Sequence, residues 1–363
     1  MERFAFLIHP IELDDIYRKY KMLRYLPKAV VEALASRLSP SIVSKIENVR
    51  GQESIAEGHF IGVPLTSRMM MKYPEKMVMQ KIIEAGKIAE AAGAKILGLG
   101  AYTSVVGDAG ETIAKNLNIA VTTGNTYTVA AAMEGVEEAC KLLNKRITEC
   151  EAAVVGANGS IGKVCAEIIL RQVNTLNLIG RDNNKLEELR SYLLCVHPNK
   201  EIRTSISISE GIANSDVVIT VTSSINEIIK PEYIKVGAIV CDVARPRDVA
   251  KSVQEKRRDV LVIEGGVIEV PKGLNFNFNY GFPEGLTYAC MAETMILALE
   301  KRYENFSLGR DMDVKKVDEI RGLAAKHGFK LAGLRSFERV IDQSHINQVI
   351  NEIDKLQRKV NNL

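Results

Sequence analysis

The sequence lacks several features that would assign it to a class at once. No stretch reaches the roughly 18 uncharged apolar residues that span a bilayer. The first ten residues, MERFAFLIHP, contain an early acid and lead to no small-residue cleavage site, so a signal peptide is not predicted. The formal charge is only +3, which is too small a bias to indicate a nucleic acid partner. We expect a cytoplasmic protein with no transmembrane segment. Peripheral contact with a membrane and an oligomeric state stay open.

Patterns for disulfides and metals are missing as well. The six cysteines are scattered with no CxxC pair, and no two of the five histidines have helical ligand spacing. Neither a disulfide framework nor a built-in metal site is therefore predicted. With 363 residues, 46% of them apolar, the chain is long enough for two domains with full-sized cores.

Strand and helix patterns alternate through most of the chain. Roughly the first fifty residues indicate short helices, at 13–22 and 27–37, and an amphipathic helix over 77–92 ends at Gly93. Short apolar strands at 95–100 and 119–122 then alternate with helices at 108–117 and up to about 145. A second series has strands at 152–156, 175–180, 216–221, 238–242 and 260–263, with helices at 161–172, 184–193 and 208–213 between them. This alternation predicts an α/β fold with parallel sheets.

The domain layout follows from where the second series begins and ends. We predict an N-terminal part of a catalytic α/β domain over 1–148 and a Rossmann dinucleotide-binding domain over 149–280. Residues 275–280 alternate Asn with Phe or Tyr, which indicates an extended segment with an aromatic face that lines either an apolar channel or the core. The pattern over 286–305 indicates a strong helix. Residues 281–363 are expected to return to the first domain as a helical segment with a C-terminal tail.

A glycine motif opens the second series. Gly156, Gly159 and Gly162 follow an apolar strand and lead into a helix. Such a turn lets the backbone approach a pyrophosphate closely, and the helix N-terminus offers free N–H groups. Cofactor contacts are therefore expected along this turn, from Gly156, Asn158, Gly159, Ser160, Ile161 and Gly162.

The end of the next strand indicates which cofactor is bound. NAD-binding domains usually place an acid there for the ribose 2′-hydroxyl, whereas this strand ends in Gly180 and Arg181. A guanidinium can pair with a 2′-phosphate, so NADP(H) is favoured. Asp182 becomes the ribose partner if the register shifts by one residue. Thr222 and Ser223 follow another strand at the same sheet edge, and they either line the cofactor ribose or cap the strand.

Cys290 is the candidate nucleophile. Pro283 and the neighbouring glycines predict a helix start just upstream, and a cysteine in the first turn of a helix faces the positive end of the dipole, which favours the thiolate. From the residues alone, a buried cysteine on a helix face is the favoured interpretation.

Taken together, these motifs resemble the long-chain acyl-[acyl-carrier-protein] reductases, which make fatty aldehydes with NADPH. The resemblance spans roughly residues 1–335. It rests on 99–104 (LGAYTS), 122–126 (TTGNT), 155–162, 265–267 (GGV), the segment around Cys290, 305–310 (NFSLGR) and 327–329 (HGF).

The resemblance implies a reaction and a set of site residues. Cys290 would take the acyl group from a thioester of acyl-carrier protein or coenzyme A, and hydride from NADPH would release the aldehyde. Thr103, Ser104, Thr123 and Asn125 are candidates for steadying the oxyanion.

The chain departs from that family at three places. Tyr127 stands where the family has His, Arg245 and Arg247 replace small residues in the turn over 241–247, and a helical tail follows about Ser336. These differences concern the acyl length and the carrier more than the reaction. Two other functions remain open: an NADP-dependent dehydrogenase of a small alcohol or carbonyl, similar to shikimate dehydrogenases, and a non-catalytic NADP-sensing module. No Lys/Asp pair for shikimate chemistry is assignable.

Overall fold

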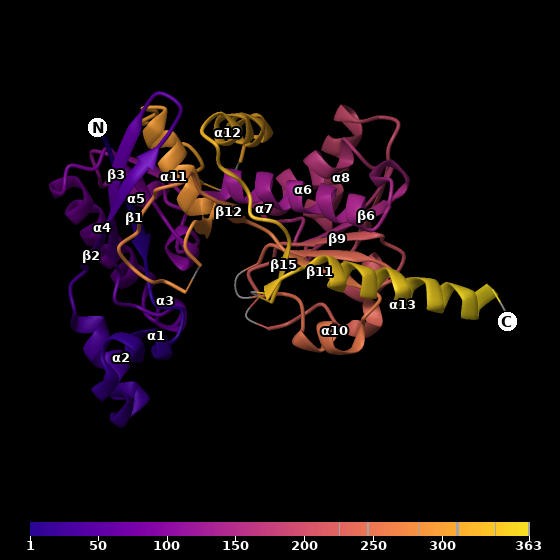
Figure 1. The fold of residues 1–363 in the computed structure, drawn as a ribbon, viewed down its shortest axis with the longest axis horizontal. Coiled ribbons are helices and arrows are strands. Elements are labelled where there is room, and N and C mark those ends of the chain that lie inside the picture. Colours follow the sequence, from indigo (N-terminus) through magenta and orange to yellow (C-terminus); the bar gives the residue numbers. More distant parts are fainter. Residues whose placement is uncertain (225, 245–246, 282, 310–311, 338, 362–363) are drawn as a thin grey trace. The chain divides into compact units, whose positions relative to one another are not determined.

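The computed structural model describes residues 1–224, 226–244, 247–281, 283–309, 312–337 and 339–361. The chain forms two compact units, and each is built from separate stretches of sequence. Unit 1 comprises Met1–Tyr127, Ile268–Asp311 and Glu319–Lys330, and unit 2 comprises Thr128–Val267, Met312–Asp318 and Leu331–Leu363. The predicted boundaries at 148/149 and 280/281 stay a prediction. Figure 1 shows the elements of both units.

Unit 1 contains a five-stranded sheet in the order β2-β3-β1-β4-β5. Strands β3, β1, β4 and β5 are parallel to their neighbours, and β2 is antiparallel to β3. The strands are β1 (Glu2–Ile8), β2 (Ser41–Arg50), β3 (Ile55–Gly62), β4 (Ile96–Gly98) and β5 (Ala120–Thr122).

The expectation of helices alone in the first fifty residues is wrong. Helices α1 (Leu13–Lys19) and α2 (Lys28–Arg37) exist, but strands β1 and β2 flank them. Strand β1 is buried on both faces from Phe4 to Leu7, so its sequence is a short apolar run without alternation, which helices and buried strands share. Strand β2 has two register shifts and buries only two of its residues, so it shows no clear period either.

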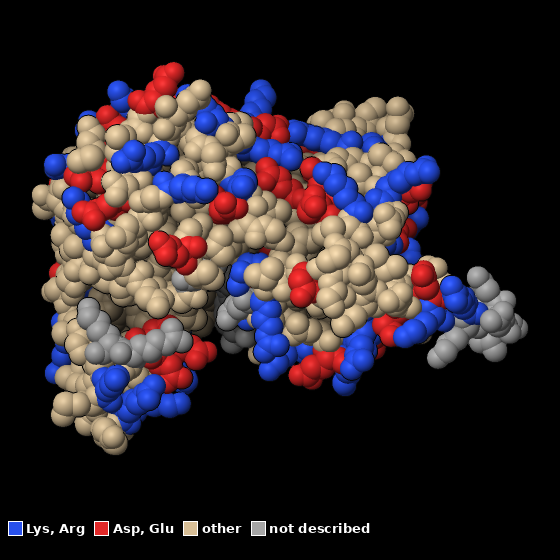
Figure 2. Space-filling model, viewed as in Figure 1, with Lys and Arg blue, Asp and Glu red and all other residues tan. Residues whose placement is uncertain are grey.

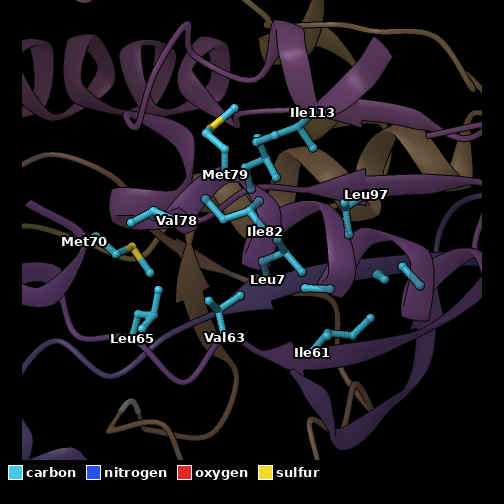
Figure 3. Packing of buried hydrophobic residues seen from close by; sticks show 14 of the residues in the cluster. Leu7, Ile61, Val63, Leu65, Met70, Val78, Met79, Ile82, Leu97 and Ile113 are labelled. Atoms are coloured by element: carbon cyan, nitrogen blue, oxygen red, sulfur yellow. The ribbon is translucent and has the colours of Figure 1, made fainter. Parts of the chain in front are cut away.

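One face of this sheet forms the main core of unit 1 with helix α4 (Glu75–Ala91). Apolar residues of α4 at helical spacing, among them Val78 and Ile82, pack over Leu7, Ile61 and Leu97 from the strands, as Figure 3 shows. Helix α11 (Ala289–Leu299) packs against β1, β3 and β4. The remaining helices of this unit are α3 (Ser67–Lys72), α5 (Glu111–Lys115), the first turn of α6 (Asn125–Leu142) and most of α12 (Val314–Lys326).

Helix α11 starts later and ends earlier than the pattern over 286–305 indicates. A short strand, β13 (Leu286–Tyr288), precedes it, and the helix ends at Leu299. The aromatic segment 275–280 forms no regular strand. Asn275 makes an isolated bridge to Glu47, and Asn277 has a φ of 48°.

Unit 2 contains a six-stranded sheet in the order β11-β10-β9-β6-β7-β8, and every neighbouring pair is parallel. Read outward from β6, this is the doubly wound Rossmann order, with its switch point between β6 and β9. The strands are β6 (Glu151–Val155), β7 (Thr175–Ile179), β8 (Glu201–Ser205), β9 (Val217–Thr220), β10 (Ile239–Asp242) and β11 (Leu261–Glu264). The predicted α/β class with a Rossmann domain is confirmed.

Helices connect the strands of unit 2. They are α7 (Ser160–Leu170), α8 (Asn183–Val196), α9 (Ile208–Ile212) and α10 (Lys251–Lys256), and the expected C-terminal tail forms α13 (Gln343–Asn361). Strand β8 was not predicted, because it is an edge strand with one buried residue. The short strands elsewhere are β12 (Val267–Glu269), β14 (Lys330–Leu331), β15 (Arg335–Ser336) and β16 (Arg339–Val340). Among the described residues, no helix combines the length and apolar character needed to cross a membrane.

Candidate functional site

Cys290 occupies the first turn of helix α11, as the sequence predicts. The helix begins at Ala289 after a Tyr288 N-cap whose side chain caps no N–H group. Every other residue of α11 is buried, and Cys290 alone is partly exposed. The Cys290 thiol therefore reaches solvent, and it lies at the positive end of the dipole of an otherwise buried helix.

The turn after strand β5 packs directly on this cysteine. Gly124 has a φ of 78°, and a β-carbon built on it would lie 2.3 Å from both Cα and Cβ of Cys290. Only glycine permits both this conformation and this approach. The TTGNT segment and the cysteine helix, which are far apart in sequence, thus form one site.

A buried carboxylate holds the turn and the helix together. Glu293 lies one helical turn after Cys290 and is fully buried. Its Oε1 accepts a hydrogen bond from the Thr122 hydroxyl at 2.5 Å, and its Oε2 accepts one from the Tyr127 backbone N–H at 2.9 Å. The Thr126 hydroxyl also donates to Oε2.

The NFS segment supplies the third part of this network. The Ser307 hydroxyl donates to Glu293 Oε1 at 2.8 Å and accepts the backbone N–H of Gly124 at 3.1 Å. Asn305 Oδ1 accepts the N–H of Val121 at 2.9 Å. Three of the motifs that carry the family resemblance therefore meet around Glu293.

The predicted polar residues of unit 1 fall into two groups. Asn125 begins helix α6 directly after Gly124, and its side-chain amide is half-buried with no hydrogen-bond partner among the described residues. Thr123 donates its hydroxyl to the Ser307 carbonyl oxygen. Thr103 and Ser104 lie in a separate 3-10 turn, where their hydroxyls donate to the carbonyl oxygens of Gly100 at 2.8 Å and Ala101 at 2.6 Å.

An aromatic cluster in unit 1 involves the segment that leads to Cys290. The rings of Phe276 and Tyr280 lie 5.7 Å and 5.6 Å from the ring of Phe60, centroid to centroid, and Phe278 lies 6.3 Å from it. The Tyr280 hydroxyl donates to the Leu286 carbonyl oxygen at 2.9 Å, and burial raises the pKa of Tyr280. Phe276 and Tyr280 are half-buried and Phe278 is exposed, so these rings cover Phe60 at the surface of unit 1.

The glycine turn of unit 2 has the geometry of a phosphate-binding loop. Gly156 has a φ of 93°, and a β-carbon on Gly162 would lie 2.2 Å from the Gly156 carbonyl oxygen. Lys163 N–H donates to the Gly159 carbonyl oxygen at 3.0 Å, so the N–H groups of Ser160 and Ile161 precede the first intrahelical bond. A pyrophosphate fits this helix start, because Gly159 has no side chain and few neighbouring atoms on the side where a β-carbon would stand.

Asp182 and Arg181 differ in what they can offer a cofactor. The Asp182 carboxylate caps helix α8 by accepting the N–H groups of Asn184 at 3.1 Å and Lys185 at 3.2 Å. Asn158 bonds to the backbone of Asp182 at both its amide oxygen and nitrogen. The Arg181 side chain is exposed and makes no ion pair or hydrogen bond with a described residue. It is therefore available for a phosphate at the end of β7.

Thr222 is engaged by a second buried carboxylate. Asp248 is fully buried and accepts hydrogen bonds from the Thr220 and Thr222 hydroxyls, both at 2.5 Å, and from the Thr222 N–H at 2.9 Å. Ser223 is exposed at the same strand end and makes no hydrogen bond with a described residue. Of the two predicted ribose contacts, only Ser223 has a side chain not already used by the fold.

The turn over 241–247 contains both unusual arginines, and the structure describes Arg247. Arg247 donates to Glu264 at 2.8 Å and lies over the Phe337 ring at 5.4 Å, so it stabilises unit 2. Arg245 lies outside the described residues. No group of three or more His, Cys, Asp or Glu in the described part of the chain is placed to hold a metal.

Sequence reasoning missed Glu293 and Asp248. Glu293 is the only charged residue in the helix ACMAETMILAL, three positions after Cys290, and that contrast is the signal that identifies it. Asp248 stands in a polar turn where nothing local distinguishes it from a solvated acid.

The chain is similar to several known proteins. The family model for shikimate / quinate 5-dehydrogenase matches residues 137–264. The chain is 27% identical over 317 residues to the long-chain acyl-[acyl-carrier-protein] reductase of Synechococcus elongatus, covering 81% of this chain and 88% of that protein. It is also 29% identical over 360 residues to the aminotransferase PigE of a Serratia species, covering 95% of this chain and 41% of that protein.

These similarities fix the coarse class. The chain is similar along most of its length to a long-chain acyl-[acyl-carrier-protein] reductase, and the family match falls in the Rossmann unit. Unit 2 is thus a domain of the type that binds NAD(P)H. The chain spans about two fifths of the length of PigE.

Proposed function

We propose that the protein reduces a fatty acyl thioester to the aldehyde with NADPH, through an acyl group carried on Cys290. The single observation that carries this proposal is the packing of Gly124 against Cys290. It sets a partly exposed thiol in the first turn of a buried helix, next to the open amide of Asn125. A cysteine that only packs in the core would be expected to be as buried as the other residues of α11.

The first step is transfer of the acyl group to the protein. The Cys290 thiolate attacks the thioester carbonyl carbon, the carrier thiolate leaves with the bonding electron pair, and an acyl-cysteine forms. The helix N-terminus favours the thiolate. The proposed donor to the transient oxyanion is the Asn125 side-chain N–H. Thr103, Ser104 and Thr123 already donate their hydroxyls to backbone carbonyls, so we assign them to shaping the turns.

The second step is release of the aldehyde. When bound, NADPH would supply hydride to the acyl carbon. The thiohemiacetal alkoxide left on Cys290 then collapses: its oxygen re-forms the C=O bond while the C–S bond breaks, which releases the aldehyde and returns the Cys290 thiolate. Residues of the glycine turn, from Gly156 to Gly162, would hold the pyrophosphate, with Arg181 on the 2′-phosphate and Ser223 near the nicotinamide ribose. Thr222 supports that edge through Asp248.

The substrate carrier and the location belong to the same proposal. The name of the Synechococcus relative supports acyl-carrier protein as donor, with coenzyme A thioesters as the alternative. The cytoplasm, where such thioesters and reduced nicotinamide meet, is the proposed location. The second relative is called an aminotransferase, and transamination consumes carbonyl compounds, so an aldehyde made here belongs to the class of substrate such a reaction takes.

The test is aldehyde formation under steady-state conditions. Purified protein with NADPH and palmitoyl-acyl-carrier protein or palmitoyl-coenzyme A should yield hexadecanal, and Cys290→Ala should yield none. Cys195, an exposed cysteine of unit 2, gives the matched control variant Cys195→Ala, which should keep full activity. Reduction of dehydroshikimate-like ketones or other small carbonyl compounds by Cys290→Ala would favour the dehydrogenase instead, which the family match over 137–264 also suits.

A further inference from the structure

A segment of unit 1 exposes more apolar surface than its own fold explains. It covers residues 20–42, from the 3-10 turn at Lys21–Tyr25 through helix α2 to the start of strand β2, and we call it the apolar arm. The 3-10 turn contains no buried residue. Met22 is 83% exposed and Tyr25 is 90% exposed, so neither side chain contributes to the core.

Helix α2 continues this surface. It packs on unit 1 through Val31 and Ala35, which are buried, and it turns Val30, Leu34 and the C-cap Leu38 outward. These three positions are four residues apart, so they form one stripe along the helix. Ile42 in strand β2 and Leu26 in the turn are exposed as well. Large apolar side chains gathered in this way mark an interaction site.

The exposed charges within the apolar arm have one sign. Lys21, Arg24, Lys28 and Arg37 are all exposed, and none forms an ion pair with a described residue. Between residues 21 and 38 the only acid is Glu32, which is half-buried. In Figure 2 blue side chains lie beside the tan surface at the lower left, where Figure 1 places α2, and red side chains lie directly above them.

We propose that the apolar arm binds the surface of an anionic lipid bilayer. An apolar stripe with exposed Met, Tyr and Leu, flanked by unpaired Lys and Arg, is the pattern of a segment that lies in the interface. The apolar side chains enter the acyl boundary, while the long basic side chains extend to the headgroups. This interaction is independent of the proposed reaction, since it uses no residue near Cys290.

The charge pattern favours lipid over the other candidate occupants. A second copy of this chain would bring the same four cations against themselves, which opposes association. An acidic protein would satisfy the charges but would leave the exposed Met22 and Tyr25 needing a matching apolar pocket. A bilayer of anionic lipid satisfies both needs with one surface.

The test is sedimentation of the full chain with vesicles. We expect the protein to pellet with vesicles of phosphatidylcholine mixed with phosphatidylglycerol, and much less with phosphatidylcholine alone. Each Lys or Arg near such a surface strengthens binding by about fivefold. A Lys21→Glu, Arg24→Glu, Lys28→Glu variant should therefore bind at least tenfold more weakly. A Met22→Ser, Tyr25→Ser, Leu34→Ser variant should also lose most of its binding.

Matched controls come from unit 2. Tyr192, Ile206 and Val236 are exposed apolar residues there, and Lys251, Lys256 and Arg258 are exposed basic residues. Replacing either trio in the same way should leave vesicle binding unchanged. Thermal unfolding and NADPH binding should be unaltered in all four variants, which shows that each has folded.

Three results would overturn the proposal. The first is absence of binding to anionic vesicles. The second is equal vesicle binding by the apolar-arm variants and the control variants. The third is a lower molar mass of the apolar-arm variants in light scattering, together with no vesicle binding by any form of the chain. The last would show that a second copy covers the arm.

Discussion

Gly124 and Cys290 pack so closely that no side chain fits between them, since a β-carbon on Gly124 would lie 2.3 Å from the cysteine Cα. The φ of Gly124, 78°, is one that other residues rarely adopt. The position of the thiol is therefore set by a backbone turn that belongs to a different motif.

Replacing this glycine should impair both folding and activity. We expect Gly124→Ala to lower the free energy of unfolding by about 2–4 kcal/mol, because strain in φ adds to a steric clash. Displacement of Cys290 should lower kcat/KM for aldehyde formation roughly a hundredfold. Gly322 in helix α12 is the control, since nothing lies within 4 Å of a β-carbon there. Gly322→Ala should stabilise by about 0.5–1 kcal/mol, as measured by urea unfolding. Equal effects of the two substitutions would contradict this account.

The stability of unit 1 should depend on the negative carboxylate of Glu293, and a neutral side chain of the same size should not replace it. Each group bonded to it donates a hydrogen bond, so the amide nitrogen of Glu293→Gln would face a donor. We expect a loss of about 2–4 kcal/mol in unfolding free energy. Glu284 is exposed in the loop before α11, and Glu284→Gln should change stability by less than about 0.5 kcal/mol.

A second substitution separates the hydrogen bond from the packing at this carboxylate. Thr126→Ser keeps the hydroxyl that donates to Glu293, whereas Thr126→Val removes it. Urea unfolding should place Thr126→Ser within about 1 kcal/mol of the native chain and Thr126→Val about 1.5–3 kcal/mol below it. Equal losses would show that volume rather than hydrogen bonding matters at this position.

Arg181 should decide between the two nicotinamide cofactors. Its guanidinium is unpaired among the described residues, and Asp182 is already used as a helix cap. We expect Arg181→Ala to raise the Kd for NADPH about tenfold or more and to leave the Kd for NADH unchanged. Arg258→Ala, an exposed arginine of the same unit, should alter neither Kd in a fluorescence titration. A parallel loss of both cofactors would exclude a 2′-phosphate contact.

His9 should make stability depend on pH near neutrality. Loss of solvent around the imidazole lowers the pKa of His9 below its ordinary value of 6.5, so the unfolded chain takes up the proton first. Stability should therefore fall as pH decreases through 6.5 toward the folded-state pKa. His9→Gln should flatten the dependence of the urea midpoint between about pH 7 and 5. The pKa of His59 is lowered by burial in the same direction, so part of the slope should persist.

The sequence predicts those parts of the fold and site that are determined by residues close together in the chain. The glycine turn at 156–162 and the helix start before Cys290 follow from residues within a few positions of each other. The Glu293 network does not, because it joins residues 166 to 171 positions apart. Strand β1 was missed because burial of both faces removes the alternation that identifies a strand. Glycine at 124 reads as a turn residue, and only the structure shows that it contacts a cysteine.

The central claim is that Cys290 carries the acyl group. The most direct measurement is the intact mass of the purified protein after mixing with palmitoyl-acyl-carrier protein or palmitoyl-coenzyme A in the absence of cofactor. The account predicts a gain of one palmitoyl group that is absent in Cys290→Ala and present in Cys195→Ala, and that is discharged as hexadecanal when NADPH is added. No gain with either donor, in protein that binds NADPH tightly, would contradict the account and leave Cys290 as a packing residue.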